Sequence, residues 1–365
     1  MATMKSVHAA KDKVDVMDVE RPVPGPKDAL VRIRACGICG TDTFFLHLGG
    51  MPSGADGATR AIPLGHEPAG EFVEVGAEVR GLAVGDRVVV NPQGAPTGII
   101  GCGGELGGMD EYLLLQNAEV GTNVAVFPDD MPLDVAALNE PMAVARHAVN
   151  RSEAKPTDKG VVFGAGPIGL GATIWLTLRG VARVTVVDVI PERLETAPAV
   201  GAGAVVDSAT EDLTARLKEL HGEAANALGQ QRAGTDVHID AAGAPAVFDA
   251  VIANAKWHAE LVMVAVQKKG EVDLGGMLRG ELTLIASQGY PTEIFEVTAE
   301  LVEHRERFAR LISHRVPFSE VGRAFELALP HHAVRRPRLR RGRSRRSRAP
   351  SRCGGARHRT GTSTP

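Results

Sequence analysis

Two cysteines three residues apart, Cys36 and Cys39, precede Thr41 and Asp42 in the stretch ACGICGTD. A thiol pair at this spacing can form a redox disulfide or half of a structural zinc knuckle, and a single thiolate can bind a catalytic metal. A redox CxxC is expected beside a thioredoxin-like βαβ unit, and a knuckle needs two further ligands nearby. The local sequence alone leaves these three alternatives open.

Other side chains suited to metal binding are scattered along the chain. His66 and Glu67 are adjacent in the turn LGHEP, and Glu140 precedes a proline at the expected start of a helix. Zinc accepts thiolate, imidazole and carboxylate ligands, and a catalytic site uses about three of them. Each residue also has an ordinary interpretation: Cys39 as a small buried side chain, His66 as a turn residue, and Glu140 as a carboxylate favoured by a helix dipole.

A glycine-rich turn, VVFGAGPIGL, holds Gly164, Gly166 and Gly169 in GxGxxG spacing between an expected strand and an expected helix. Asp188 ends the next expected strand, 24 residues after Gly164. In dinucleotide-binding turns the first glycine permits the tight turn, the second admits the pyrophosphate, and the third lets helix and strand pack closely. The helix N-terminus attracts the phosphates. The pattern therefore predicts a dinucleotide-binding turn.

The acidic residue after the second strand bears on the choice of cofactor. A carboxylate at Asp188 accepts hydrogen bonds from the ribose 2′-OH of NAD and repels the 2′-phosphate of NADP. Arg193 lies nearby but follows a Pro-Glu turn, so it argues only weakly for NADP. We predict NAD, with the cofactor-binding residues Gly164, Gly166, Pro167, Ile168, Gly169, Asp188 and Arg193.

The elements that must position these residues change in type along the chain. The first ~150 residues alternate apolar and polar positions between Gly and Pro punctuation, which predicts strands and turns. Residues 132–150 are the first sustained helical stretch. From residue 159 short apolar strands alternate with helices, which predicts a parallel sheet covered on both faces. Residues 292–329 are expected to be mostly helical.

A length of 365 residues suits two domains or one large one, and the composition is that of an ordinary globular protein. No stretch approaches the roughly 20 apolar residues needed to span a bilayer, and the N-terminal residues lack the apolar region of a secretory signal. Four cysteines are too few for a disulfide scaffold, so we expect a reducing, cytoplasmic location.

From about residue 5 to residue 329 the chain resembles the medium-chain, zinc-dependent alcohol dehydrogenase superfamily. CGICGTD, GHEPAGEFVEVG, GDRVVV, EPMAVARHAV and VVFGAGPIGL occur in that family's order and at about its separations. The resemblance implies an α/β protein with a GroES-like β-rich catalytic domain over residues 1–150, to which residues 291–330 return. It implies a Rossmann doubly wound parallel sheet over residues 151–290, with the active site between the two domains.

The resemblance also implies roles for single residues. Cys39 and His66 match zinc ligands, and Glu67 matches a ligand or a carboxylate close to the metal. Glu140 is expected to be a further zinc ligand, because it stands where the ethanol-type branch has cysteine. This substitution is typical of the sorbitol, butanediol and threonine dehydrogenase branch. Thr41 matches the Ser/Thr that passes on the substrate proton.

Cys36 then takes no part in metal binding, and Asp42 is expected to be structural. Relatives with a second, structural zinc carry four closely spaced cysteines in one lobe, where this chain offers only Cys102. We therefore predict one catalytic zinc per subunit and no structural zinc.

These assignments predict an oxidoreductase that transfers hydride from a secondary alcohol, diol or polyol to NAD. The family implies a homodimer or homotetramer, and we expect a small-molecule substrate with neither a membrane nor a nucleic acid as partner. Two alternatives stay open: a zinc-free quinone or enoyl reductase of the same superfamily, and a dinucleotide-binding protein without catalytic activity.

Two features depart from the family pattern. Many relatives have a histidine two residues after the Asp of the cysteine motif, where it ends a proton relay; here this position is Phe44. The relay beyond Thr41 is therefore undefined. His47 lies three residues further on and is expected at the surface, whereas Phe44 and Phe45 are expected to line the substrate pocket or the core.

The second departure is the C-terminal segment. Residues 331–365 contain twelve arginines and no acidic residue, and without them 29 basic residues face 44 acidic ones, a formal net charge of −15. The segment has no apolar periodicity that could bury a core. A nucleic-acid-binding arm is one interpretation. The dominance of Arg, Pro, Gly and Ser favours an out-of-frame terminus, in which the closing strands of the family are absent.

Overall fold

The computed structural model describes residues 2–11, 13–53, 58–266 and 270–329. The hypotheses on residues 331–365 concern a segment that lies outside these ranges. Residues up to Ala328 form one compact unit. None of the helices in the described ranges is both long and apolar enough to cross a bilayer.

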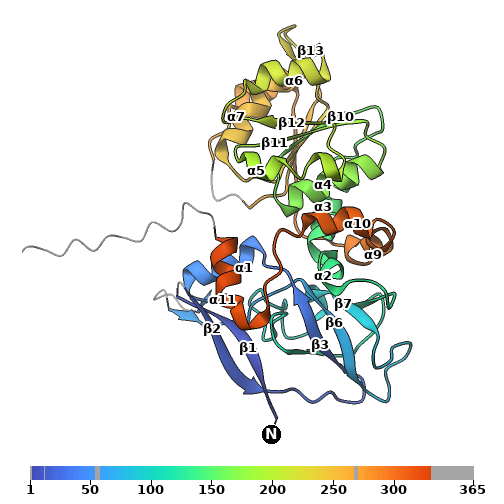
Figure 1. The fold of residues 1–365 in the computed structure, drawn as a ribbon. Coiled ribbons are helices and arrows are strands. Elements are labelled where there is room, and N and C mark those ends of the chain that lie inside the picture. Colours follow the sequence, from blue (N-terminus) through green and yellow to red (C-terminus); the bar gives the residue numbers. More distant parts are fainter. Residues whose placement is uncertain (1, 12, 54–57, 267–269, 330–365) are drawn as a thin grey trace, which may run out of the picture. The chain divides into compact units, whose positions relative to one another are not determined.

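Antiparallel strands dominate the N-terminal part of the chain (Figure 1). The strands are β1 (Thr3–Ala10), β2 (Lys13–Glu20), β3 (Ala29–Cys36), β4 (Met51–Pro52), β5 (Thr59–Arg60), β6 (Pro68–Val75), β7 (Arg87–Val90), β8 (Tyr112–Leu115) and β9 (Val124–Phe127). Five of them form a sheet in the order β8-β3-β6-β7-β9, and β1 pairs with β2. The GroES-like, β-rich part predicted from the sequence is confirmed.

The pairing of β3 with β6 decides where the site forms. The register shifts twice along this pair, and Cys36 at the end of β3 lies opposite Pro68 at the start of β6. Such irregularities bend and twist a strand. The chain that leaves β3 toward Cys39 and the chain that enters β6 from His66 therefore meet at the same end of the sheet.

The expectation of only strands and turns before residue 132 was wrong at one place. Helix α1 (Gly40–Leu48) begins directly after Cys39. Cys39 and Asp42 form a reciprocal cap at its N-terminus, and Gly49 ends it in the left-handed region at φ 77°. Such capping stabilises a short helix by satisfying amide groups that have no partner within it.

The second sheet is parallel. Its strands are β10 (Lys159–Phe163), β11 (Arg183–Asp188), β12 (Ala204–Asp207), β15 (Val237–Asp240), β16 (Glu260–Met263) and β17 (Thr283–Ala286). In space the strands follow the order β12-β11-β10-β15-β16-β17. The chain therefore adds β11 and β12 on one side of β10 and then β15, β16 and β17 on its other side. This is the order of the doubly wound dinucleotide-binding fold, whose ligands bind at the reversal point. The predicted Rossmann sheet is confirmed.

Helices connect these strands. They are α4 (Pro167–Leu178), α5 (Pro191–Leu194), α6 (Leu213–His221), α7 (Pro245–Asn254) and α8 (Leu274–Gly280). The alternation of strands and helices predicts one helix over residues 191–202 after β11, and this prediction is wrong. Helix α5 stops early and a 3₁₀ turn, η2 (Pro198–Val200), follows, because Pro198 has no amide hydrogen to continue the helix. Helix α8 and the ribbon of β13 (Glu223–Ala225) and β14 (Gln231–Ala233) were not predicted.

The remaining helices lie before the parallel sheet and after it. They are η1 (Pro92–Gly94), α2 (Leu133–Ala136), α3 (Asn139–Arg151), α9 (Glu293–Glu303), α10 (Arg305–Phe308), η3 (Ala309–Leu311), η4 (Phe318–Glu320) and α11 (Val321–Ala328). Nδ2 of Asn139 donates to the Ile294 carbonyl at 2.6 Å, which joins α3 to α9. Phe325 of α11 is buried in the apolar cluster that includes Val7 and Phe45. The domain boundaries near residues 150 and 290 stay a prediction.

Candidate metal centre and dinucleotide-binding turn

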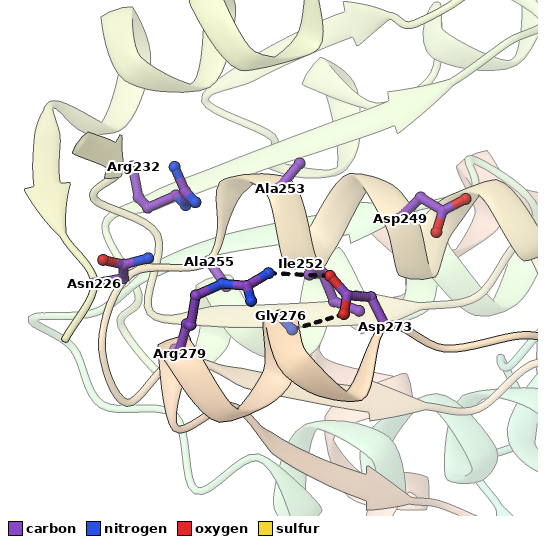
Figure 2. A pocket seen from close by; sticks show the side chains of 10 residues that line it. Asn226, Arg232, Asp249, Ile252, Ala253, Ala255, Asp273, Gly276 and Arg279 are labelled. Carbon is purple, nitrogen blue, oxygen red and sulfur yellow. Dashed lines mark hydrogen bonds and ion pairs between the residues drawn. The ribbon is translucent and has the colours of Figure 1, made fainter. Parts of the chain in front are cut away.

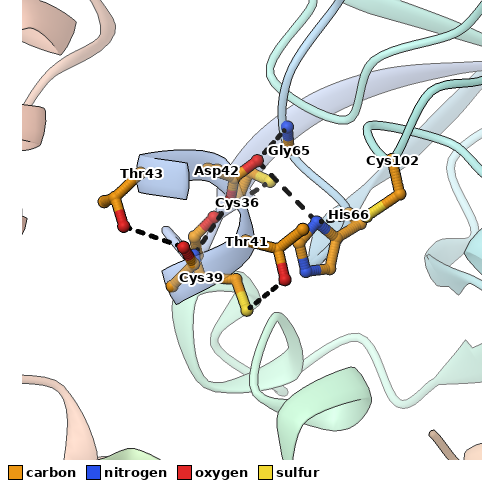
Figure 3. A network of polar contacts seen from close by, with 10 residues as sticks. Cys36, Cys39, Thr41, Asp42, Thr43, Gly65, His66 and Cys102 are labelled. Atoms are coloured by element: carbon orange, nitrogen blue, oxygen red, sulfur yellow. Dashed lines mark hydrogen bonds and ion pairs between the residues drawn. The ribbon is translucent and has the colours of Figure 1, made fainter. Parts of the chain in front are cut away.

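Asp42 ties together the two loops that carry the predicted metal ligands (Figure 3). Its Oδ2 accepts the Cys39 amide at 2.9 Å, and its Oδ1 accepts the Gly65 amide at 2.9 Å. The side chain is fully buried. The structural role expected for Asp42 thus takes a concrete form, since one carboxylate caps α1 and fixes the residue before His66.

Three of the predicted ligands meet. One donor atom from each of Cys39, His66 and Glu67 lies within 4.8 Å of the other two. The group offers sulfur, nitrogen and oxygen, which is a donor set that zinc accepts. His66 and Glu67 are buried, whereas Cys39 is partly exposed. Gly37 makes room for this arrangement, because a Cβ there would lie 1.7 Å from Oε2 of Glu67.

Glu140 is buried in the first turn of α3 beside this group but is not one of its three members. Burial raises the pKa of Glu140 and of Glu67, and the charge of Glu140 raises the pKa of Glu67 further. Tyr290, in the loop before α9, is a hydrogen-bond partner of Glu140 and of Gln93. Tyr290 was not predicted as a site residue, because nothing in its local sequence indicates a contact with a residue 150 positions earlier.

The electrostatics of the group suit a cation. Burial acts to lower the pKa of His66, but hydrogen bonds to Cys102 and Cys39 and the charge of Asp42 outweigh it and raise that pKa. Surroundings that favour a positive charge on an imidazole also favour a metal ion beside it. A metal ion would likewise relieve the repulsion between the two buried glutamates. The residues therefore fit zinc.

Some side chains of α1 lie at the site, and others lie in the core or at the surface. Thr41 lies at the site, with its Oγ1 3.7 Å from Sγ of Cys39. Phe45 is buried in the core, but Phe44 is 48% exposed. His47 is exposed, as expected.

Cys36, which was expected to take no part in metal binding, is not a member of the group formed by Cys39, His66 and Glu67. Cys36 packs at the end of β3, where burial raises the pKa of its thiol well above the ordinary value. Cys102 instead approaches the site, with its sulfur 3.4 Å from Nδ1 of His66. No role at this centre was predicted for Cys102.

The glycine-rich turn has the geometry that a dinucleotide requires. Gly164 has φ 98°, in the left-handed region. A Cβ on Gly169 would lie 1.8 Å from the Gly164 carbonyl oxygen, so only glycine lets helix and strand approach this closely. A Cβ on Gly166 would meet nothing within 4 Å, which leaves space above the start of α4. Pro167 begins that helix, and Ile168 packs against the core.

Asp188 lies at the end of β11, directly against this turn. Its Oδ2 accepts the Ala165 amide at 2.7 Å, and its Oδ1 accepts the amides of Val189 and Ile190 at 2.7 and 3.0 Å. The carboxylate thus joins the turn to the loop after β11 before any ligand is considered. Arg193 is exposed on α5.

A cavity of about 230 Å³ lies elsewhere, among α7, α8 and the β13–β14 ribbon (Figure 2). Arg279 donates to Asp273, and Arg232 donates to Gln230. None of the predicted site residues lines this cavity. Three of its charged side chains, Arg232, Asp273 and Arg279, pair within the chain, and the cavity is not the candidate site.

Comparison with known proteins follows the same division of the chain. Residues 25–125 match the family model of the alcohol dehydrogenase GroES-like domain, and residues 167–304 match that of zinc-binding dehydrogenases. The chain is 33% identical over 316 residues to (R,R)-butanediol dehydrogenase of Bacillus subtilis (strain 168), covering 81% of this chain and 86% of that protein.

Solved structures of zinc-binding and butanediol dehydrogenases have the same fold as this chain. The crystal structure of 2R,3R-butanediol dehydrogenase from Bacillus subtilis superposes with a TM-score of 0.74 at 28% identity, covering 89% of this chain and 96% of that one. A protein of Sinorhizobium meliloti 1021 assigned as a zinc-binding dehydrogenase, bound to NADP, has a TM-score of 0.75 at 28% identity with the same coverage.

Proposed function

Because the chain belongs to the zinc-dependent medium-chain alcohol dehydrogenase superfamily, we propose that it oxidises a secondary alcohol, diol or polyol with NAD. The observation that carries this proposal is the meeting of Cys39, His66 and Glu67 within 4.8 Å. A zinc-free reductase of the same superfamily would not need this donor set.

The metal and the dinucleotide would be held by different parts of the chain. Cys39, His66 and Glu67 would bind one zinc ion, and the turn from Gly164 to Gly169 would bind the pyrophosphate of the cofactor. When bound, zinc supplies Lewis acidity toward the alcohol oxygen, and the nicotinamide supplies the hydride acceptor.

The chain's own residues then position the substrate and move its proton. The Thr41 hydroxyl, next to Cys39, would take the alcohol proton as it gives its own proton toward a ribose hydroxyl of the cofactor. Glu140 lies beside the ligand group and adds a second carboxylate, which with Glu67 gives the site a harder, more oxygen-rich character than a two-thiolate centre. Such a site suits substrates with several hydroxyl groups, and Tyr290 holds Glu140 in place through its hydroxyl.

We propose NAD rather than NADP as the cofactor. Asp188 is already fixed beside the turn by three backbone amides, and its negative charge disfavours a 2′-phosphate at that position. Because a structural relative is bound to NADP, kcat/KM must be compared for NAD and NADP. Arg193, exposed on α5, is the residue through which NADP would be accommodated.

We infer that residues 1–150 with 291–330 act as the catalytic domain and residues 151–290 as the dinucleotide-binding domain. We also infer a single zinc per subunit, a homodimer or homotetramer, and a cytoplasmic location.

The direct test measures NADH formation with butanediols, polyols and hydroxy-amino acids, with and without a zinc chelator, and repeats each assay with NADP. We expect turnover of at least one diol or polyol, a preference for NAD in kcat/KM, loss of activity with chelator, and recovery on adding zinc. Quinone or enoyl reduction that survives chelation would support the zinc-free alternative. A protein that binds NAD but turns over none of these compounds would support the non-catalytic alternative.

A further inference from the structure

Cys102 contacts the imidazole of His66 on the side that faces away from the proposed metal. We propose that Cys102 is a positioning residue: its sulfur accepts a hydrogen bond from Nδ1 of His66 and so presents Nε2 to the metal. The inference rests on the proposed zinc site at Cys39, His66 and Glu67, but it assigns a role to a residue outside that set.

The distances identify Cys102 as the nearest acceptor. Its Sγ lies 3.4 Å from Nδ1, whereas Oδ1 of Asp42 lies at 3.7 Å. That oxygen is also occupied, because it accepts the Gly65 amide at 2.9 Å, and the other oxygen of Asp42 accepts the Cys39 amide. Figure 3 shows Nδ1 turned toward Asp42 and Cys102, with the second ring nitrogen on the side of Thr41 and Cys39.

The chemistry fixes the direction of the hydrogen bond. Asp42, as a carboxylate, can only accept a hydrogen bond, so its position beside Nδ1 favours a proton on that nitrogen. Nε2 then carries the lone pair that a metal needs. A metal-binding histidine usually donates its other N–H to a nearby acceptor, which fixes the ring orientation. In this chain the sulfur of Cys102 takes that place.

The backbone holds Cys102 in position independently of this hydrogen bond. Gly101, with φ 67°, packs so closely on the loop before His66 that a Cβ would lie 2.0 Å from the Gly65 carbonyl oxygen. The Gly108 amide donates to the same Gly65 oxygen at 2.8 Å, and the Cys102 amide donates to the Ile99 carbonyl at 3.1 Å. The loop that carries Cys102 is therefore locked against the loop that carries His66.

The test compares zinc affinity, measured by competition with a chromophoric chelator, in the wild type and in Cys102→Ala, Cys102→Ser and Cys36→Ala. Losing an outer partner of a metal ligand typically weakens metal binding by 10- to 100-fold. Because sulfur is a weak acceptor, we expect Cys102→Ala to weaken zinc binding about 10-fold, at the low end of that range. Cys102→Ser should recover part of the loss, because its hydroxyl also accepts a hydrogen bond. Cys36→Ala removes a nearby thiol that bonds to the Glu67 backbone instead of the His66 ring, so it should weaken zinc binding less than Cys102→Ala does.

A second readout separates positioning from ligation. Cobalt(II) bound by a thiolate has a sulfur-to-metal absorption band, whose intensity follows the number of thiolate ligands. We expect Cys102→Ala to keep the intensity of this band, shifted slightly in position, and Cys39→Ala to abolish it. A band that loses intensity in Cys102→Ala would make Cys102 a ligand and overturn the proposal.

The remaining outcomes distinguish this inference from the proposed function. Tight zinc binding by the wild type with equal affinity in Cys102→Ala would overturn the role of Cys102 and leave the metal site standing. A wild-type protein that binds no zinc would overturn both. Thermal unfolding of the zinc-free variants verifies that each is folded. If Cys102→Ala does not fold, the zinc affinity of Cys102→Ser is compared with that of the wild type instead.

Discussion

Gly166 and Gly169 stand three residues apart in one turn and differ in what an added methyl group would meet. At Gly169 the methyl group would overlap the Gly164 carbonyl oxygen, whereas at Gly166 it would point into open space in the free protein. The backbone at Gly166 has φ −82°, which alanine adopts without strain. The two positions therefore separate the demands of folding from those of cofactor binding.

We predict that Gly166→Ala leaves the stability of the free protein within about 0.5 kcal/mol of the wild type. The same substitution should weaken NAD binding by about tenfold or more, because the methyl group occupies the place of the pyrophosphate. Gly169→Ala should instead destabilise the free protein by about 1–3 kcal/mol through overpacking. Denaturant unfolding and NAD titration check both. Unchanged NAD affinity in Gly166→Ala would mean that the pyrophosphate does not bind at this turn.

At this scale the sequence predicted the residues that belong to motifs. Cys39, His66 and Glu67 were assigned through their resemblance to a family, and the structure brings their donor atoms together. Cys102 and Tyr290 were not predicted, because their contacts with the site depend on how loops pack and not on a local pattern. Glu140, the fourth predicted ligand, lies beside these three residues, and its binding to the metal stays a prediction.

At the scale of elements, periodicity predicted the strands and helices that bury a continuous apolar face. The parallel strands and α4 were found where the alternation of patterns placed them. Helix α1 was missed because its stability comes from the cap formed by Cys39 and Asp42 and not from apolar spacing. The closeness of the Cys39 and His66 loops could be predicted only through the family resemblance and not from periodicity, since it follows from the antiparallel pairing of β3 with β6.

At the scale of the whole molecule, two buried histidines in the parallel-sheet region make stability depend on pH. His221 lies between the hydroxyls of Thr185 and Thr235, and the Nδ1 of His238 contacts the Glu260 carbonyl at 3.0 Å. Burial lowers the pKa of each histidine from its ordinary value of 6.5 to about 4.

The direction of this pH dependence follows from which state, folded or unfolded, binds more protons. Between pH 6.5 and 4 the unfolded chain protonates these histidines while the folded chain does not, so their contribution to stability is complete above pH 6.5 and is lost as the pH falls toward 4. The loss should amount to a few kcal/mol for the pair. Asp110, whose pKa burial raises to about 7, acts in the opposite direction, so only a comparison between variants isolates the histidines.

We predict that His238→Phe flattens the dependence of the unfolding free energy on pH between 6.5 and 4, whatever its effect at neutral pH. Phenylalanine keeps a ring against Phe163, which stacks on His238 at 6.4 Å, but it cannot titrate. His258→Asn is the matched control, because His258 is largely exposed and asparagine tolerates its left-handed backbone. Denaturant unfolding of the metal-free protein over this pH range gives the slopes. Equal slopes in His238→Phe and the wild type would show that His238 does not contribute.

The central claim is that Cys39, His66 and Glu67 share one zinc ion, and its most direct test is a crystal structure of the zinc-loaded protein with anomalous diffraction recorded at the zinc edge. We predict one strong anomalous peak per subunit, in contact with Sγ of Cys39, Nε2 of His66 and a carboxylate oxygen of Glu67, with the sulfur of Cys102 on the opposite side of the imidazole. A peak bound by other residues, or no peak at these three in a protein that is active and saturated with zinc, would contradict the account.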